Sequence, residues 1–308
     1  MLLKTNLDIP IDSIKINFDS EELWILNIAL AIIMFGVALS IKIDDFKLLI
    51  KKPKILFVGI FSQFFLLPAL TFVAILIIKP HPSFALGMMM IAACPGGNIS
   101  NFFSKMANGN AALSVSLTAF ATLICIIMTP FNLQFYGGLY EPTNAILKTV
   151  ELDPFSLFKL VLLILGVPLI LGMLTNIYFE ETAKKIEKKL KPFSMIIFLA
   201  LIVIEVYDNL DIFLNYIHLV AGLVIFHNIG AYFIGFYTAK TFGLEKRDRK
   251  TISMETGIQN GGLGLLLIFQ FFDGLGGMAL FAAFWSIWNI FSGLVLATFW
   301  TKDNKQLK

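Results

Sequence analysis

Nine apolar segments, each long enough to cross a lipid bilayer, constrain this chain more than any other feature of its sequence. An α-helix rises about 1.5 Å per residue, so roughly 20 apolar residues span the hydrocarbon layer of about 30 Å. Because lipid cannot hydrogen-bond exposed backbone groups, such segments fold as helices. Of the 308 residues, 57% are hydrophobic. The sequence therefore predicts an all-α polytopic membrane protein with about nine transmembrane helices, at residues 23–41, 55–78, 84–106, 111–135, 156–178, 193–211, 213–239, 251–272 and 277–300.

The lysines and arginines cluster on one side of this arrangement. Most of the 24 basic residues fall in the connections after the first, fifth and seventh segments and after the last one. Cytoplasmic connections carry such an excess, so we expect the N-terminus outside and the C-terminus in the cytoplasm. A bacterial inner membrane is the expected location. Topology explains the basic connections, so we expect no nucleic-acid partner.

The chain is expected to consist of one membrane domain and two short tails. Residues 1–22 carry several carboxylates and lack the basic start and apolar stretch of a signal peptide. We expect them to form an extracytoplasmic tail. Residues 23–300 form the membrane domain, in contact with lipid, and 301–308 form a cytoplasmic tail. The sequence leaves the oligomeric state open.

Two of the apolar segments contain a helix-breaking stretch. The third segment contains Ala-Cys-Pro-Gly-Gly-Asn at 93–98, and the eighth contains Gln-Asn-Gly-Gly at 259–262. Proline removes a backbone donor, and glycine weakens a helix. If segments one to four correspond to segments six to nine, the two breaks occupy matching positions. The two halves of the chain then have opposite orientations in the membrane. This inverted repeat is typical of the central site of a transporter. Chance is the alternative, because glycine is common in membrane helices.

Glu255 is a carboxylate inside the eighth apolar segment, where a charge is costly and usually functional. Gln259 follows four residues later, on the same face of a helix. With the carbonyls freed at the break, these side chains predict an oxygen-lined pocket for a small hard cation. The alternative is a tolerated kink in which Glu255 is paired with a neighbour.

Further side-chain oxygens lie near the first break and in the neighbouring segments. Each of them could instead join helices to one another, as polar groups often do in membranes. The histidines and cysteines are scattered, which favours Na⁺ or H⁺ over zinc, copper or iron. We expect His227 and Asn228 to satisfy hydrogen bonds within the protein core. The oxygen-bearing residues are Gln63, Asn98, Ser100, Asn101, Ser114 and Thr118.

Three stretches together resemble the bile acid:sodium symporter family: ACPGGNISNFFSKMANGNAALSVSLTA at 93–119, HNIGAYFIGF at 227–236 and ETGIQNGGLGL at 255–265. The resemblance extends over about 23–300. It implies two crossing discontinuous helices, in the third and eighth segments, and an organic-anion cavity between two domains. The implied panel domain comprises 23–41, 156–178 and 193–211, and the implied core comprises 55–135 and 213–300.

The resemblance also implies the function and the ligands. It implies a symporter that couples an organic anion, bile acid-like or a small carboxylate, to two Na⁺ ions by alternating access. One sodium site would comprise Ser100, Asn101, Ser114, Thr118 and Glu255. The other would comprise Gln63, Glu255 and Gln259 with the backbone oxygens of Thr256 and Ile258. The implied substrate contacts are Asn98, Asn260 and Asn289.

Three other classes of function are weighed against this interpretation. A transporter of the same fold could use protons or exchange anions. An enzyme is not expected, because the sequence has no HExxH, no DDxxD and no serine with a histidine partner. A receptor that does not transport is the third class. The identity and valence of the anion are left open.

Overall fold

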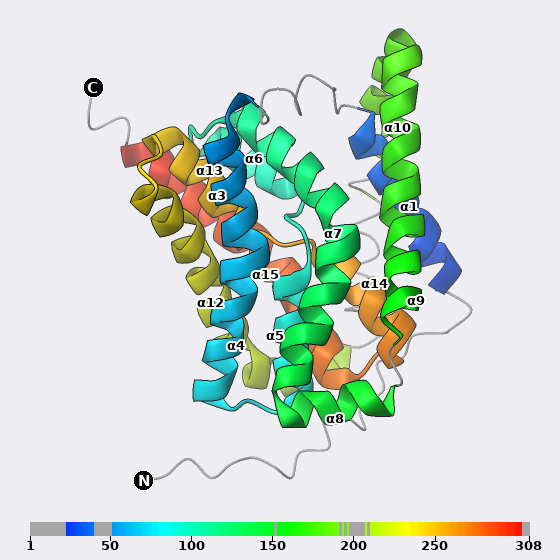
Figure 1. The fold of residues 1–308 in the computed structure, drawn as a ribbon, viewed down its shortest axis with the longest axis vertical. Helices are drawn as coiled ribbons and strands as arrows, with labels where there is room; N and C mark the ends of the chain where they lie inside the picture. Colours follow the sequence, from blue (N-terminus) through cyan, green and yellow to red (C-terminus); the bar gives the residue numbers. More distant parts are fainter. Residues whose placement is uncertain are drawn as a thin grey trace.

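The computed structural model describes residues 23–39, 51–150, 153–190, 193, 196, 207 and 210–303. Within these residues every regular element is a helix (Figure 1). In the described part of the chain, five helical stretches are long and apolar enough to cross a membrane: Pro53–Ile78, Ala111–Leu139, Phe158–Tyr178, Leu214–Thr241 and Gly276–Thr301. They match five of the expected segments and confirm an α-helical membrane protein.

These long stretches are built from the following elements. The first consists of α3 (Pro53–Phe61), the π-helical turn η3 (Ser62–Leu66) and α4 (Leu67–Ile78). The third consists of α9 (Pro154–Val161), the π-helical turn η4 (Leu162–Gly166) and α10 (Val167–Tyr178). The others are α7 (Ala111–Leu139), α12 (Leu210–Thr241) and α15 (Gly276–Asp303).

The remaining expected segments are less complete. The first appears as α1 (Leu23–Ala38). The expected segment 193–211 lies almost wholly outside the described residues, as do the tail at 1–22 and residues 304–308 of the expected tail at 301–308, whose first three residues end α15. The total of nine spans, the inverted repeat and the division into panel and core therefore stay predictions.

Both expected interruptions occur. The third segment is divided into α5 (Pro82–Ala93) and α6 (Ile99–Met106), which together we call the first interrupted helix. The eighth is divided into α13 (Lys246–Gly257) and α14 (Gly261–Phe272), the second interrupted helix. Helix α13 begins five residues before the expected start of its segment, inside the basic connection.

The π-helical turn η3 lies just before a proline. Pro68 has no N–H group to donate to the carbonyl of Phe64, four residues earlier. Asn132 of α7 donates its Nδ2 to that carbonyl at 2.9 Å. The same order of π-helical turn and proline occurs at η4 and Pro168. A neighbouring helix thus satisfies the backbone group that the proline leaves unpaired, as expected in a membrane.

Two helical stretches of the described residues are not among the expected elements: residues 180–190, which follow α10, and the short helix α8. Helix α8 (Glu141–Thr149) connects α7 to α9, and Thr143 and Leu147 on it are buried. It packs against α5 and α7. With only nine residues, α8 falls below the length that an apolar segment needs to span a bilayer, so a search for apolar segments does not find it.

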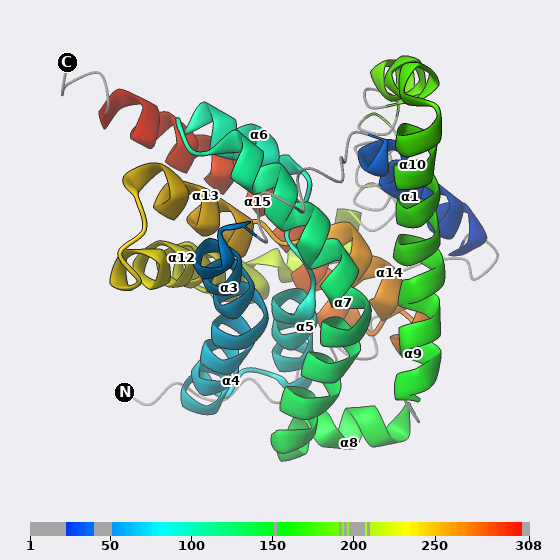
Figure 2. The ribbon, with the colours of Figure 1, turned by 45° about the horizontal axis from the view of Figure 1, so that its top comes forward.

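The two breaks lie at the centre of the described helices. Helix α5 packs against α7 and α15, and α14 packs against α15. Figures 1 and 2 show α12 and α13 on one side of this centre, and α1 with α10 on the other. The largest apolar cluster joins α5, α7, α14 and α15 and includes the fully buried Trp285 and Phe281. This packing holds both breaks in the protein interior.

Candidate cation-binding site

The two interrupted helices meet through their backbones at the breaks. The amide of Gly97 donates to the carbonyl of Ile258 at 2.7 Å, and the amide of Asn260 donates to the carbonyl of Pro95 at 2.8 Å. Gly96 and Gln259 form an isolated antiparallel bridge between these bonds. Backbone groups that each break frees are thus paired with the other break, away from lipid and water.

Glycine is required where the first break approaches the second. A Cβ atom on Gly96 would lie 2.9 Å from Oε2 of Glu255 and 3.0 Å from Nε2 of Gln63. A Cβ atom on Gly97 would lie 3.1 Å from the carbonyl oxygen of Gln259. The absence of side chains at these two positions leaves the room that the carboxylate and amides occupy.

The carboxylate of Glu255 is buried and bonded to three hydroxyl groups. Ser100 and Ser114 each donate to Oε1 at 2.5 Å, and Thr118 donates to Oε2 at 2.8 Å. Asn101 joins them, since its Oδ1 lies 3.3 Å from the Thr118 hydroxyl. The structure therefore brings together the whole first set of sequence-derived candidates. We call Ser100, Asn101, Ser114, Thr118 and the Glu255 side chain the carboxylate set.

Oxygen acceptors outnumber donors in the carboxylate set. The single hydroxyl hydrogen of Thr118 has three acceptors within reach, on Glu255, Ser114 and Asn101. Within the described part of the chain, no lysine or arginine forms an ion pair with Glu255. A buried carboxylate among surplus oxygens is an arrangement that a small cation stabilises.

The second set of candidates contacts the backbone of the same helix end. Nε2 of Gln63 donates to the backbone carbonyl of Glu255 at 3.5 Å, and Nε2 of Gln259 donates to that of Thr256 at 2.8 Å. The Oε1 atom of Gln259 is buried without a hydrogen-bond partner. We call Gln63, Gln259 and the backbone oxygens of Thr256 and Ile258 the amide set; with Glu255 they form the second set of candidates.

The unpartnered oxygen makes the amide set different from an ordinary buried network. A buried polar atom without a partner costs about 1–3 kcal/mol. A cation coordinated by Oε1 of Gln259 would remove that cost. One backbone oxygen of the set, that of Ile258, already accepts the amide of Gly97. It can bind a cation only through its second lone pair.

The three asparagines expected to contact a substrate have different surroundings. Oδ1 of Asn260 accepts the amide of Leu263 and caps the start of α14. Nδ2 of Asn289 donates to the carbonyl of Gln259 at 3.0 Å. Asn98 precedes α6, and its side chain makes no cap. Two of the three side chains therefore also support the second break, and a substrate role stays a prediction for all three.

Other residues support the site. Asn228 donates to the carbonyl of Gly257 at 2.7 Å, and His227 bonds to Thr71 at 2.7 Å, which confirms the expected core hydrogen bonds. Sequence reasoning missed Thr129, which donates to the carbonyl of Ala93 at the end of α5. Polar side chains three or four residues apart along α7 were the available signal.

Comparison with known proteins gives consistent matches. The model of the Sodium Bile acid symporter family matches residues 27–216. A protein of Bacillus subtilis named as the uncharacterized sodium-dependent transporter YocS is 32% identical over 293 residues, which cover 94% of this chain and 88% of that protein.

Two relatives from eukaryotes are also similar. A probable sodium/metabolite cotransporter of Arabidopsis thaliana, the chloroplastic BASS1, is 28% identical over 91% of this chain and 68% of its own length. The human ileal sodium/bile acid cotransporter is 29% identical over 77% of this chain and 66% of its own length. Each of these relatives is named as a sodium-dependent transporter or cotransporter.

Proposed function

The chain belongs to the sodium bile acid symporter family, and on that premise we propose that it is a sodium-coupled symporter of a small organic anion. Membership makes it an integral membrane protein of a sodium-dependent transporter family. Family membership alone does not give the coupling ion of this chain, the number of ions or the class of anion, which are proposed here.

The observation that carries the proposal is the buried Glu255 carboxylate, bonded to three hydroxyl groups and paired with no basic residue in the described part of the chain. A carboxylate that is removed from water is stabilised by a cation that contacts its oxygens directly. Every candidate ligand is an oxygen, and oxygen ligands suit hard ions. Na⁺ meets this requirement, and it is the ion named for the relatives.

Two Na⁺ ions are proposed per transport cycle. One binds at the carboxylate set, and the other binds at the amide set, where the oxygen of Gln259 has no partner. Glu255 is proposed to take part in both, with its carboxylate shared between the two ions. Binding of either ion therefore favours the same geometry of the second break.

The organic anion is proposed to bind beside the crossing of the two interrupted helices, in contact with Asn98, Asn260 and Asn289. Asn260 uses its oxygen to cap α14, so its NH₂ group can donate to a carboxylate. Amide and hydroxyl donors suit an anion here, because both arginines, Arg247 and Arg249, lie in the basic start of α13 and none lies in an apolar segment. The relatives' names support a bile acid-like molecule or a small carboxylate as the class.

Transport is proposed to proceed by alternating access, with the panel helices and the core helices moving relative to one another. The N-terminus is placed outside and the C-terminus in the cytoplasm. A tag attached before Trp24 is then accessible from outside intact cells, and a tag attached at the C-terminus is not. Two ends on one side would contradict an odd number of spans.

The test of function is uptake into liposomes that contain the purified protein. Carboxylates and sulfated organic anions are first screened for thermal stabilisation of the protein, with NaCl and with KCl. A stabilising anion is then used in uptake under an inward Na⁺ gradient. Uptake that needs Na⁺ at constant pH supports the proposal. Uptake driven by a pH gradient in K⁺ would instead show proton coupling, and uptake that needs only a counter-anion would show exchange.

The proposed stoichiometry has its own test. Two Na⁺ with one monovalent anion move one net positive charge inward, and 100 mV adds about 2.3 kcal/mol per charge. An inside-negative potassium diffusion potential should therefore speed the uptake of a monovalent anion. Uptake that does not respond to voltage would show that only one Na⁺ is coupled.

A further inference from the structure

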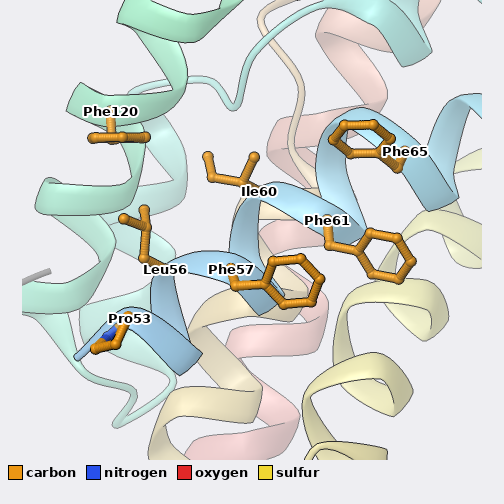
Figure 3. A pocket seen from close by; sticks show the side chains of 7 residues that line it. All are labelled: Pro53, Leu56, Phe57, Ile60, Phe61, Phe65 and Phe120. Carbon is orange, nitrogen blue, oxygen red and sulfur yellow. The ribbon is translucent and has the colours of Figure 1, made fainter. Parts of the chain in front are cut away.

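An apolar groove lies on α3 and η3 near their lysine-rich end. Seven side chains, all apolar, line a volume of about 270 Å³: Pro53, Leu56, Phe57, Ile60, Phe61, Phe65 and Phe120. Figure 3 shows Phe120 of α7 across from Leu56 and Ile60. The rings of Phe57, Phe61 and Phe65 stack in turn, with centroids 5.3 and 6.0 Å apart. The groove therefore has one wall on each of two helices.

This groove faces away from the candidate cation site. Thr118 contacts Glu255, and Phe120 follows it by two residues, which is about 200° around a helix. Gln63 and Phe65 are related in the same way, and Phe65 is 47% exposed whereas Gln63 is 2% exposed. In a membrane protein, an exposed aromatic surface of this kind lies against lipid.

Positive charge is concentrated at one end of the groove. Lys52 and Lys54 flank Pro53, which lines the groove, and Lys51 precedes them. All three lysines are exposed. Within the described part of the chain, no carboxylate forms an ion pair with any of them. An occupant with an apolar chain and a negative head would satisfy both the groove and the lysines.

We propose that the groove binds one acyl chain of an anionic phospholipid, with its headgroup phosphate at Lys52 and Lys54. The volume is below the usual 300–1,000 Å³ of pockets for drug-sized molecules and suits a narrow chain. Attraction between anionic lipid and lysines near the membrane surface favours this lipid over a zwitterionic one. The groove faces away from the candidate cation site, so lipid binding there can be tested independently of the transport proposal.

The experiment places a photoreactive benzophenone side chain at Phe57 of the full-length protein. The matched control carries it at Phe131 of α7, because the two phenylalanines are 54% and 53% exposed and only Phe57 lines the groove. Both proteins are illuminated in vesicles of equal phosphatidylglycerol and phosphatidylcholine, and the adducts are identified by mass spectrometry. We expect phosphatidylglycerol adducts to be enriched at Phe57 over Phe131, by about fivefold for each lysine at low salt.

The lysines are tested in the same assay. In the double variant Lys52→Gln, Lys54→Gln, the ratio of phosphatidylglycerol to phosphatidylcholine adducts at Phe57 should fall to the value found at Phe131. Lys188→Gln with Lys189→Gln removes the same charge from another exposed basic segment and should leave the ratio unchanged. Equal lipid ratios at Phe57 and Phe131 in the unmodified protein would overturn the proposal. So would equal losses in the two lysine variants, or crosslinks from Phe57 to a second copy of the chain.

Discussion

The two interrupted helices cross through reciprocal backbone bonds, but they contribute different things to the site. The first break, between α5 and α6, carries Gly96 and Gly97 where a Cβ atom would meet Glu255, Gln63 or Gln259. The break itself contributes room, while α6, which follows it, contributes the oxygens of Ser100 and Asn101. The second break, between α13 and α14, carries the carboxylate, an amide and freed carbonyls. It contributes oxygens.

The two breaks also differ in the side chains that bond to them and cap the helices after them. The carbonyls of the second break are held by asparagines from two other helices, Asn228 of α12 and Asn289 of α15. Helix α14 is also capped by the Asn260 side chain, whereas the Asn98 side chain does not cap α6. Two breaks that look alike in sequence are therefore expected to respond differently to substitution.

The largest effect is expected from Glu255→Gln, which removes the charge of the second break and nearly keeps its shape. Each hydrogen bond to a charged group contributes about 1.5–3 kcal/mol, so apparent Na⁺ affinity should fall at least tenfold. Sodium-dependent thermal stabilisation and uptake should both be lost. Glu141→Gln on α8, where the side chain is exposed, is the control. Sodium dependence that survives in Glu255→Gln would make this carboxylate structural.

Gly96→Ala tests whether the first break contributes room. The added methyl group would press on the Glu255 carboxylate and the Gln63 amide, and overpacking of this kind costs about 1–3 kcal/mol. We expect a lower melting temperature and weaker Na⁺ stabilisation. Gly138→Ala is the matched control, because nothing lies within 4 Å of a Cβ atom there. A tolerated Gly96→Ala would mean that the two breaks are not so closely packed.

The carboxylate set and the amide set should be separable by two double variants. Ser114→Ala with Thr118→Ala should weaken one Na⁺ site, and Gln63→Ala with Gln259→Ala the other, by about 1–3 kcal/mol per lost ligand. Titration of melting temperature with NaCl measures this. In the absence of Na⁺, the Gln63→Ala, Gln259→Ala variant should lose less stability than its lost contacts alone imply. The reason is that it no longer buries the unpartnered oxygen of Gln259. Unchanged Na⁺ titrations in both variants would reject the two-site assignment.

The smallest effect is expected from the helix caps. Asn260→Ala removes the cap of α14 and should destabilise the protein by about 1 kcal/mol. Asn98→Ala should have almost no effect on stability, because Asn98 caps nothing. Melting temperatures in KCl compare the two variants. Equal destabilisation by the two variants would show that Asn260 and Asn98 do not differ in how they support the two breaks.

The sequence by itself determined the class of the protein and the position of both breaks. The length of an apolar run, a proline beside paired glycines and a carboxylate among apolar residues are local signals, and each is contained within a single segment of the chain. Glu255 could be singled out for this reason. The oxygen-bearing residues of α6 and α7 could be proposed as its partners, and the resemblance to a family supplied their grouping.

Only the tertiary structure decided how these parts meet. Ser100 and Ser114 reach one carboxylate oxygen across 155 and 141 residues of chain, and Asn132 reaches the carbonyl that Pro68 leaves unpaired across 68. The bonds of Asn289 and Asn228 to the second break are of the same kind. Such contacts depend on how whole helices pack and rotate against one another, and periodicity within one helix does not encode that. In lipid every freed backbone group needs a partner, and helix packing decides which side chain provides it.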